Sequence, residues 1–131
     1  MELGYTIIYV ADVPATVTFY ENAFGLTRRF VHDSLLYAEM ETGQTALAFA
    51  GNEAAEMNGL AVVPNTAKTT PAAWEICFVT EDVDTDYGRA VAAGCSPVSP
   101  PTAKPWGQIV SYVRDLNGCL IEIASPVANN G

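Results

Sequence analysis

The chain contains the same segment twice, and this repeat constrains the fold more than any other feature of the sequence. The stretch Tyr9–Val13 has the pattern of a strand that runs into a helix, and Phe78–Val83 has the same pattern. Asp82 lies 70 positions after Asp12. Two copies in 131 residues leave about 65 residues each, which is few for an independently stable fold. The two copies are therefore expected to share one sheet or one interface, with any ligand site between them.

The first copy predicts a β-α-β-β-β order of elements within about residues 1–50. An alternating stretch rich in β-branched and aromatic residues predicts a strand over Gly4–Val10. A helix is expected to begin at Asp12, a typical N-cap residue, and to end at Gly25, a typical C-cap residue. Three strands follow, at about Leu26–Val31, Leu35–Glu41 and Thr45–Ala50.

The second copy, about residues 74–126, repeats this order. Residues 51–73 separate the copies and carry glycine, asparagine and proline without a clear period, which predicts a linker or mobile loop. The prolines between residues 97 and 105 predict that any strand there is short and lies at a sheet edge. The other expected elements are a strand over Trp74–Thr80, a helix over Val83–Ala93 and a hairpin of Gln108–Arg114 and Cys119–Ala124. One domain, residues 1–131, is expected to contain both modules.

Composition and charge exclude several classes of function. Half of the residues are hydrophobic and 16% are charged, which supports a folded core. No apolar run is long enough to cross a membrane and no secretion signal is recognisable, so a cytoplasmic protein is expected. A net charge of −9 argues against nucleic acid and anionic membranes as partners and suits a cationic ligand. The same acidity can also serve only to keep the protein in solution.

Two carboxylates are predicted near the middle of the sheet. Glu122 lies between two isoleucines of the last strand, and Glu75 precedes Ile76 in the strand that opens the second copy. Tyr5 occupies the corresponding face of the first strand, because side chains alternate along a strand. A carboxylate among apolar side chains requires a metal, a cation, a proton or water. These carboxylates are therefore the sharpest chemical clue in the sequence.

Aromatic side chains add candidate ligand contacts. Tyr9 and Tyr112 combine ring area with a polar tip, and Tyr37 is a further candidate. Trp106 follows four prolines and precedes a glycine, so it is expected either to stack on a flat or cationic ligand or to cover a sheet edge. Cys77 shares the face of Glu75, but no histidine near it is expected to activate the thiol.

The order and spacing of several short segments carry a family resemblance, although no single segment is specific. The chain resembles the vicinal oxygen chelate superfamily, which includes glyoxalase I, ring-cleaving dioxygenases and the bleomycin and fosfomycin resistance proteins. The segments that carry this resemblance are Tyr9–Val13, Phe19–Tyr20, Phe24–Leu26, Asp82–Asp84, Ala93–Gly94, Pro105–Gln108, Arg114–Gly118 and Ile121–Ile123.

The resemblance implies an α+β fold in which paired βαβββ modules form a cupped mixed sheet around a cleft, usually completed in a homodimer. It also implies that metal-dependent members place four ligands on the cleft face. Carried over by position, those four places are Tyr5, Glu75, Glu122 and either Ala46 or Ala48. A tyrosine and an alanine make this a poor donor set, and the only histidine, His32, lies in a turn away from it.

Two functions of different class therefore remain open, and a third is weaker. The first is metal-free binding of a small cationic or aromatic molecule, with no cofactor, as in drug-resistance proteins that sequester their ligand. The second is a glyoxalase-like, lyase or dioxygenase-like enzyme with a divalent metal at Glu75 and Glu122. The third is a metal-free acid–base enzyme that uses one of these carboxylates. The candidate ligand-binding residues are Tyr5, Tyr9, Glu75, Trp106, Tyr112 and Glu122, and the catalytic candidates are Glu122 and Glu75.

Overall fold

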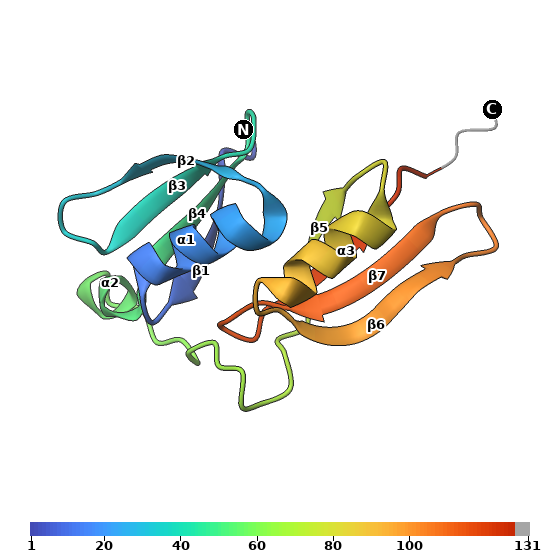
Figure 1. Ribbon diagram of the computed structural model, residues 1–131. Coiled ribbons are helices and arrows are strands. Elements are labelled where there is room, and N and C mark those ends of the chain that lie inside the picture. Colours follow the sequence, from blue (N-terminus) through green and yellow to red (C-terminus); the bar gives the residue numbers. More distant parts are fainter. Residues whose placement is uncertain (128–131) are drawn as a thin grey trace. The chain divides into compact units, whose positions relative to one another are not determined.

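The computed structural model describes residues 1–127, and the chain divides into two compact units (Figure 1). Unit 1 comprises Met1–Asn65 and unit 2 begins at Thr66. Each unit holds one four-stranded sheet and a helix that packs against it, so the protein is α+β as expected. Within residues 1–127, none of the helices has the length and hydropathy that crossing a membrane requires.

Unit 1 has the β-α-β-β-β order that the sequence predicts, with one further helix at its end. In its sheet β1 runs parallel to β4, β3 pairs antiparallel with β4 and β2, and the spatial order is β1-β4-β3-β2. The elements are β1 (Tyr5–Val10), α1 (Val13–Phe24), β2 (Thr27–Val31), β3 (Tyr37–Glu41), β4 (Ala46–Gly51) and α2 (Asn52–Met57).

Local chemistry explains both ends of α1. Asp12 is the N-cap, and its Oδ1 accepts a hydrogen bond of 3.0 Å from the backbone N–H of Ala15. Gly25 ends the helix in the left-handed conformation, with a φ of 67°, which costs glycine little. The buried face of the helix packs on the sheet, where the rings of Tyr20 and Phe49 lie 4.8 Å apart between centroids.

Unit 2 repeats this topology, which confirms the predicted repeat. Its strands follow the spatial order β5-β8-β7-β6, with β5 parallel to β8 and the other pairs antiparallel. Asp82 caps α3 as Asp12 caps α1, and it accepts a hydrogen bond of 3.1 Å from Thr85 N–H. The elements are β5 (Ile76–Val79), α3 (Val83–Ala92), β6 (Ser96–Ala103), β7 (Ile109–Arg114) and β8 (Leu120–Ala124).

The interpretation of residues 51–73 as an unstructured linker is wrong at its beginning, where α2 forms. Gly51, the N-cap residue, makes no side-chain cap, and the helix has six residues, too few for a visible apolar period. Ala54, Ala55 and Met57 favour a helix, and Ala55 is buried. A short helix with one buried face residue leaves little signal in the sequence.

Two strands of unit 2 also differ from expectation. β6 lies at the sheet edge as expected, but it is eight residues long rather than short. Its pairing with β7 shifts register on both sides of Ser99, so the strand continues past prolines that cannot donate a backbone hydrogen bond. β5 begins at Ile76, so Trp74 and Glu75 precede the strand instead of lying within it. The predicted alternation of faces holds: Ile121 and Ile123 are buried, and Glu122 between them is half-buried.

Gly118 occupies a position that only glycine fits, in the turn before β8. Its φ is 81°, and a Cβ built there would overlap the backbone carbonyl of Thr66. Arg114 holds the same segment by donating to the carbonyls of Thr66, at 3.3 Å, and Thr69, at 2.6 Å. The start of unit 2 therefore rests directly on this turn.

Replacement of Gly118 by alanine should destabilise the protein more than replacement of Gly43. Gly43 has a φ of 94° but open space around it, so Gly43→Ala adds only backbone strain of about 1–2 kcal/mol. Gly118→Ala adds a clash worth about another 1–3 kcal/mol. Urea-induced unfolding followed by circular dichroism measures both. Equal shifts in the two variants would contradict the close approach of Thr66.

Candidate functional site

The helix-free face of the sheet in unit 2 carries two carboxyl groups side by side. Glu122 lies in β8 directly opposite Cys77 of β5 and Tyr112 of β7. Glu75 lies two residues before Cys77, and its carboxyl group interacts with that of Glu122. The structure therefore brings together Glu75, Glu122 and Tyr112 of the residues that the sequence singled out, with Cys77 beside them.

The pKa of Glu75 lies well above the usual range of a carboxyl group. The hydrogen bond with Glu122 raises the pKa of Glu75 to about 7, and burial and the negative charge of Glu122 act in the same direction. On its other side Glu122 is held by Tyr112, whose hydroxyl donates a hydrogen bond of 3.0 Å to Oε1. A carboxyl group that gains and loses its proton near pH 7 is the chemically distinctive feature of unit 2.

The neighbours of this pair stay protonated at neutral pH. Burial and the hydrogen bond to Glu122 raise the pKa of Tyr112 to about 12. Burial and the charge of Glu122 raise the pKa of the Cys77 thiol to about 11. A thiol with so high a pKa is a poor nucleophile. Tyr112 and Cys77 therefore surround the pair as neutral groups.

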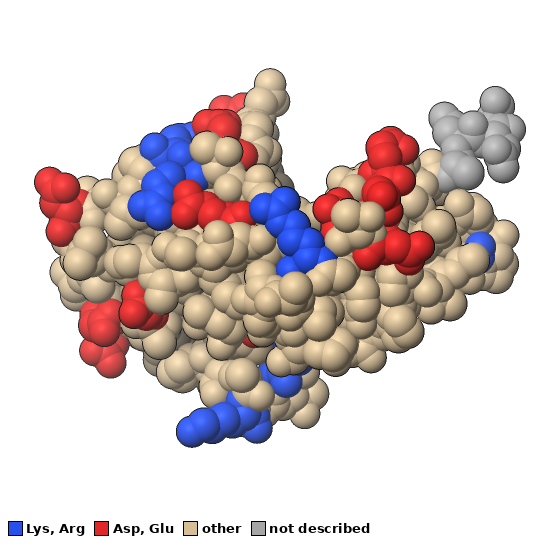
Figure 2. All heavy atoms as spheres, viewed as in Figure 1, with Lys and Arg blue, Asp and Glu red and all other residues tan. Residues whose placement is uncertain are grey.

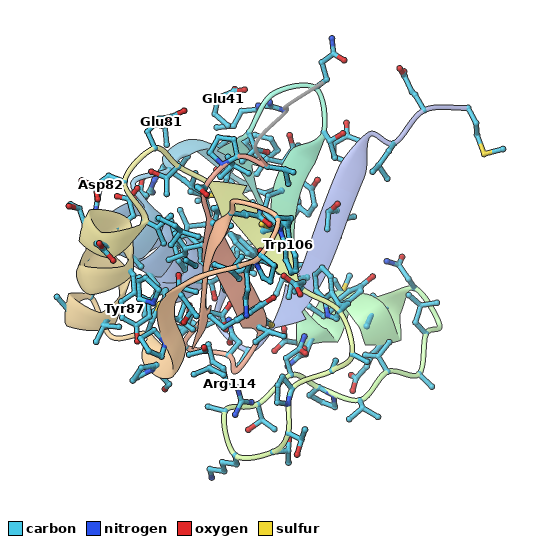
Figure 3. All side chains as sticks on the ribbon, turned by 90° about the vertical axis from the view of Figure 1, so that its right-hand side faces the viewer. Glu41, Glu81, Asp82, Tyr87, Trp106 and Arg114 are labelled. Atoms are coloured by element: carbon cyan, nitrogen blue, oxygen red, sulfur yellow. The ribbon has the colours of Figure 1, made fainter. Side chains whose placement is uncertain are left out.

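Trp106 lies in the turn between β6 and β7, and its indole is oriented by hydrogen bonds (Figure 3). Its Nε1 donates to Gln108 Oε1 at 2.8 Å, and Gln108 Nε2 donates to the carbonyl of Ser125 at 3.0 Å. The side chain is 56% exposed. An exposed, oriented ring is available for stacking, although a ligand contact at Trp106 stays a prediction.

The other two predicted aromatic contacts belong to unit 1. Tyr5 is 57% exposed and borders a polar cavity of about 650 Å³. Tyr9 is half-buried, and its carbonyl accepts a hydrogen bond of 3.0 Å from the side chain of Asn65. The cavity beside Tyr5 is lined by Glu2, Leu3, Gly4, Tyr5, Arg29, Gln44 and Thr45.

Unit 1 has a charged cluster on its own helix-free face that the sequence analysis missed. Glu39 is 8% exposed and accepts hydrogen bonds from Arg29 Nη1, at 3.1 Å, and from the hydroxyl of Tyr37, at 2.8 Å. Arg29 also binds both oxygens of Glu41, at 2.9 and 2.8 Å. Burial, followed by the hydrogen bond to Glu39, raises the pKa of Tyr37. The sequence did contain a signal for this cluster. Tyr37, Glu39 and Glu41 alternate along one expected strand, and the strand before it carries an arginine.

The resemblance implies metal ligands at four positions, and strand register shows which residue of β4 takes one of them. In unit 1 Ile7 pairs with Ala48, and in unit 2 Cys77 pairs with Glu122. Ile7 and Cys77 are 70 residues apart, which is the spacing of the repeat. Ala48 therefore occupies in unit 1 the position that Glu122 occupies in unit 2. Alanine cannot bind a metal. Among residues 1–127, no group of three or more histidine, cysteine, aspartate or glutamate side chains is arranged to hold one.

The glyoxalase/bleomycin resistance protein/dioxygenase superfamily model matches residues 2–123 of the chain. The chain belongs to this superfamily. Its expected βαβββ modules are those that the structure shows. A comparison with curated proteins finds no match to the chain.

Solved structures of other superfamily members share the fold. A glyoxalase-related enzyme from Fulvimarina pelagi is 24% identical, with a TM-score of 0.81 over 100% of this chain and 95% of that one. A family member from Burkholderia phytofirmans PsJN is 22% identical, with a TM-score of 0.80 over 98% and 100%. A member from Nocardioides is 21% identical, with a TM-score of 0.75 over 100% and 88%. At these identities the likeness establishes the fold alone.

The raised pKa of Glu75 predicts how the free energy of unfolding depends on pH. The pKa of Glu75 is about 7 in the folded protein and near 4.5 without its neighbours, so between these values the folded state binds a proton that the unfolded state lacks. This contribution to the free energy of unfolding falls as pH rises from about 4.5 to about 7 and then levels off. Glu75→Gln mimics the protonated form and removes the dependence.

Thermal unfolding of wild type and Glu75→Gln at pH 5 and pH 8 tests this prediction. The variant should gain stability relative to wild type between the two values. Glu81→Gln removes a carboxylate elsewhere in unit 2 and serves as the control. A difference between wild type and Glu75→Gln that stays constant with pH would show that the pKa of Glu75 is not raised in the folded protein.

Proposed function

We propose that this superfamily member is a metal-free binding protein that sequesters a small cationic or aromatic molecule. The carboxyl pair Glu75–Glu122 receives the cationic group, and no chemical step is performed on the ligand. The observation that carries the proposal is the place of Glu75 beside Glu122, which raises the pKa of Glu75 to about 7, so that Glu75 holds a proton below that pH. A ligand ammonium or amidinium group can replace this proton and pair with two negative charges at once.

The charges of the protein support a cationic ligand. The net charge of −9 attracts cations over long distances. Figure 2 shows acidic side chains gathered over the start of α3, which carries Asp82, Asp84 and Asp86 in unit 2. Tyr112 holds Glu122 in place before a ligand arrives, which lowers the entropy lost on binding.

Unit 1 supplies an internal example of the proposed recognition. There a carboxylate that is bonded to a tyrosine hydroxyl, Glu39 with Tyr37, is paired with the guanidinium of Arg29. Unit 2 also has a carboxylate bonded to a tyrosine hydroxyl, Glu122 with Tyr112, and the neighbour of Glu122 there is a second carboxyl group, that of Glu75. The chain thus already pairs this combination of groups with a cation once.

Binding of 9-aminoacridine, a flat aromatic cation, tests the proposal by isothermal titration and fluorescence. Glu122→Gln should weaken binding about tenfold or more, because a charge-assisted hydrogen bond contributes about 1.5–3 kcal/mol. Added salt should weaken it further, and acridine, the neutral analogue at pH 8, should bind less tightly than the cation. Trp106→Ala should weaken binding more than Trp106→Phe if the indole stacks on the ligand.

Glu81→Gln is the matched control, since it changes the net charge by the same amount as Glu122→Gln. Glu81 precedes the N-cap of α3 and belongs to the same unit. It should change the affinity less than about twofold, as expected for a distant screened charge. Equal effects of the two variants would contradict binding at the carboxyl pair.

Affinity for the cation should rise with pH. Glu75 loses its proton as pH rises through about 7, and the ionised pair attracts the cation more strongly. Between pH 6 and pH 8 the ionised fraction of a group with this pKa rises about tenfold, and affinity should rise by up to that factor. Glu75→Gln should show a flat profile. An affinity that does not change with pH in wild type would show that binding does not depend on the ionisation of Glu75, which would contradict the proposal.

A metal-free acid–base reaction at the same pair is the second candidate, and the pKa of Glu75 is the observation that favours it. A carboxyl group with a pKa of about 7 can take a proton from carbon and return it at neutral pH. Incubation of chelator-treated protein with dihydroxyacetone in D₂O, followed by NMR, measures such exchange. Deuterium incorporation that Glu75→Gln abolishes would favour the enzyme over sequestration.

We also propose that the protein acts as a homodimer. β1 and β5 are edge strands of their sheets, and they expose the apolar side chains of Ile7 and Val79. Exposed apolar edges are commonly covered in an assembly. Light scattering coupled to gel filtration gives the mass directly. A monomer at micromolar concentration would contradict this assembly and would leave the carboxyl pair unaffected.

A further inference from the structure

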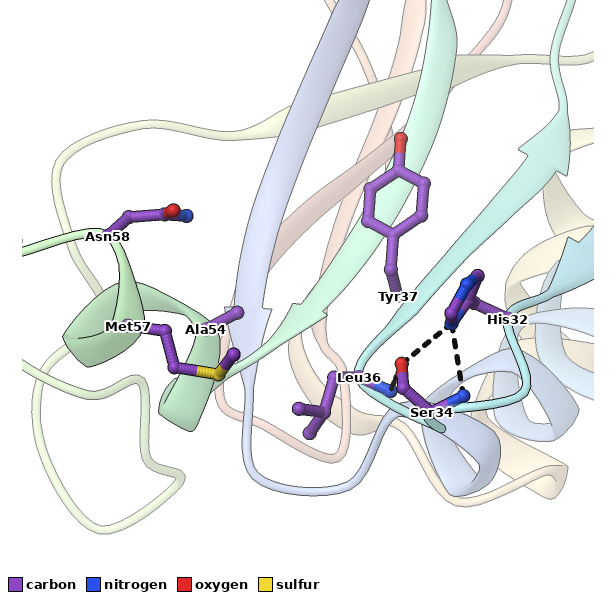
Figure 4. Close-up of a pocket in the computed structure, with 7 residues that line it drawn as sticks. All are labelled: His32, Ser34, Leu36, Tyr37, Ala54, Met57 and Asn58. Carbon is purple, nitrogen blue, oxygen red and sulfur yellow. Dashed lines mark hydrogen bonds between the residues drawn. The ribbon is translucent and has the colours of Figure 1, made fainter.

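Unit 1 contains a cavity that lies apart from the carboxyl pair in the chain and differs from it in chemistry. Its volume is about 410 Å³, and it lies between the turn that joins β2 to β3 and the short helix α2 (Figure 4). The lining residues are His32, Ser34, Leu36, Tyr37, Ala54, Met57 and Asn58. Every lining residue belongs to unit 1, so the cavity is complete within that unit.

The lining is mainly apolar and holds no carboxylate, lysine or arginine. Leu36, Ala54 and Met57 provide aliphatic surface, and Tyr37 provides a ring. The hydroxyl of Tyr37 points away from His32 and Ser34 in Figure 4 and is already bonded to Glu39. The ring is therefore the part of Tyr37 that a ligand can contact. A cavity without an opposite charge to pair with favours an uncharged ligand over an ion.

His32 gives the cavity a defined hydrogen-bond donor. The backbone N–H of Ser34 donates to Nδ1 of His32 at 3.0 Å, and an N–H group can only donate, so Nδ1 carries no proton. The neutral ring then carries its proton on Nε2. The hydroxyl of Ser34 also lies 2.8 Å from Nδ1 and accepts from Leu36 N–H at 3.2 Å. Ser34 thus fixes the ring and its tautomer.

The turn that presents His32 is held in a strained conformation. Leu35 has a φ of 61°, the only positive φ among the non-glycine residues of the described chain, 1–127. Backbone strain of this kind costs about 1–3 kcal/mol and is concentrated at functional positions. The hydrogen bonds from Leu35 N–H to His32 O and from His32 N–H to Tyr37 O, both 2.8 Å, hold the turn closed.

We propose that this cavity binds a neutral, mainly apolar small molecule with one hydrogen-bond acceptor, such as an aromatic ketone or amide. The aliphatic wall and the ring of Tyr37 take the apolar body, and His32 Nε2–H donates to the acceptor, with Asn58 as a further polar residue of the lining. The cavity is large enough for two fused rings with a short substituent. The inference does not depend on the carboxyl pair of unit 2.

Prodan, an uncharged naphthyl ketone whose emission shifts to the blue in apolar surroundings, is a suitable probe. Wild type should show a saturable blue shift. Ala54→Phe fills the cavity and should weaken binding at least tenfold, whereas Glu56→Gln, a change on the same helix at a residue outside the lining, should leave it unchanged. Glu122→Gln should also leave prodan binding unchanged, which separates this site from the one proposed for cations.

His32→Ala and amide NMR provide a second test that does not rely on Ala54→Phe. Loss of the donor should weaken prodan about fivefold, the effect of a hydrogen bond worth about 1 kcal/mol. Prodan should shift amide resonances of residues 32–37 and 54–58 in wild type. Absence of saturable binding, shifts confined to other residues, or equal affinity in wild type and a folded Ala54→Phe would each overturn the proposal.

Discussion

Each sheet of this protein packs one face against a helix, and the placement of every functional group depends on that constraint. Side chains alternate along a strand, so the burial of Ile121 and Ile123 requires Glu122 to point to the opposite face. In unit 1 the burial of Ile8 and Val10 sends Tyr5 and Ile7 to the exposed face in the same way. The apolar contacts that stabilise the fold therefore also decide where polar groups can accumulate.

The two units satisfy a carboxylate on the helix-free face by different means. In unit 1 Arg29 and Tyr37 saturate Glu39, which is almost fully buried, so its charge is neutralised within the unit. In unit 2 the hydroxyl of Tyr112 donates to Glu122, and the neighbouring Glu75 has a pKa raised to about 7, so it can hold a proton beside Glu122. A proton is easily exchanged for another cation, whereas a covalently attached arginine is not. This difference makes unit 2 the more suitable place for a cationic ligand.

Membership of the superfamily explains the architecture but leaves the chemistry to individual positions. The repeat aligns Tyr5 with Glu75 by sequence, and strand register aligns Ala48 with Glu122. Unit 1 has a tyrosine and an alanine at these places, while unit 2 has two carboxyl groups. The same βαβββ scaffold can therefore hold different sites because the exposed face contributes little to the core.

The sequence by itself determined the repeat, the caps at Asp12 and Gly25, and the division of each strand into a buried and an open face, because these depend on patterns of residues close together in the chain. The helix α2 escaped detection because one turn and a half has no measurable period. The Arg29–Glu39–Tyr37 cluster and the approach of Glu75 to Glu122, which raises the pKa of Glu75, were decided only by the tertiary structure. Both join residues that are distant in the chain, and a register shift of one residue would turn the side chains that lie in strands to the other face.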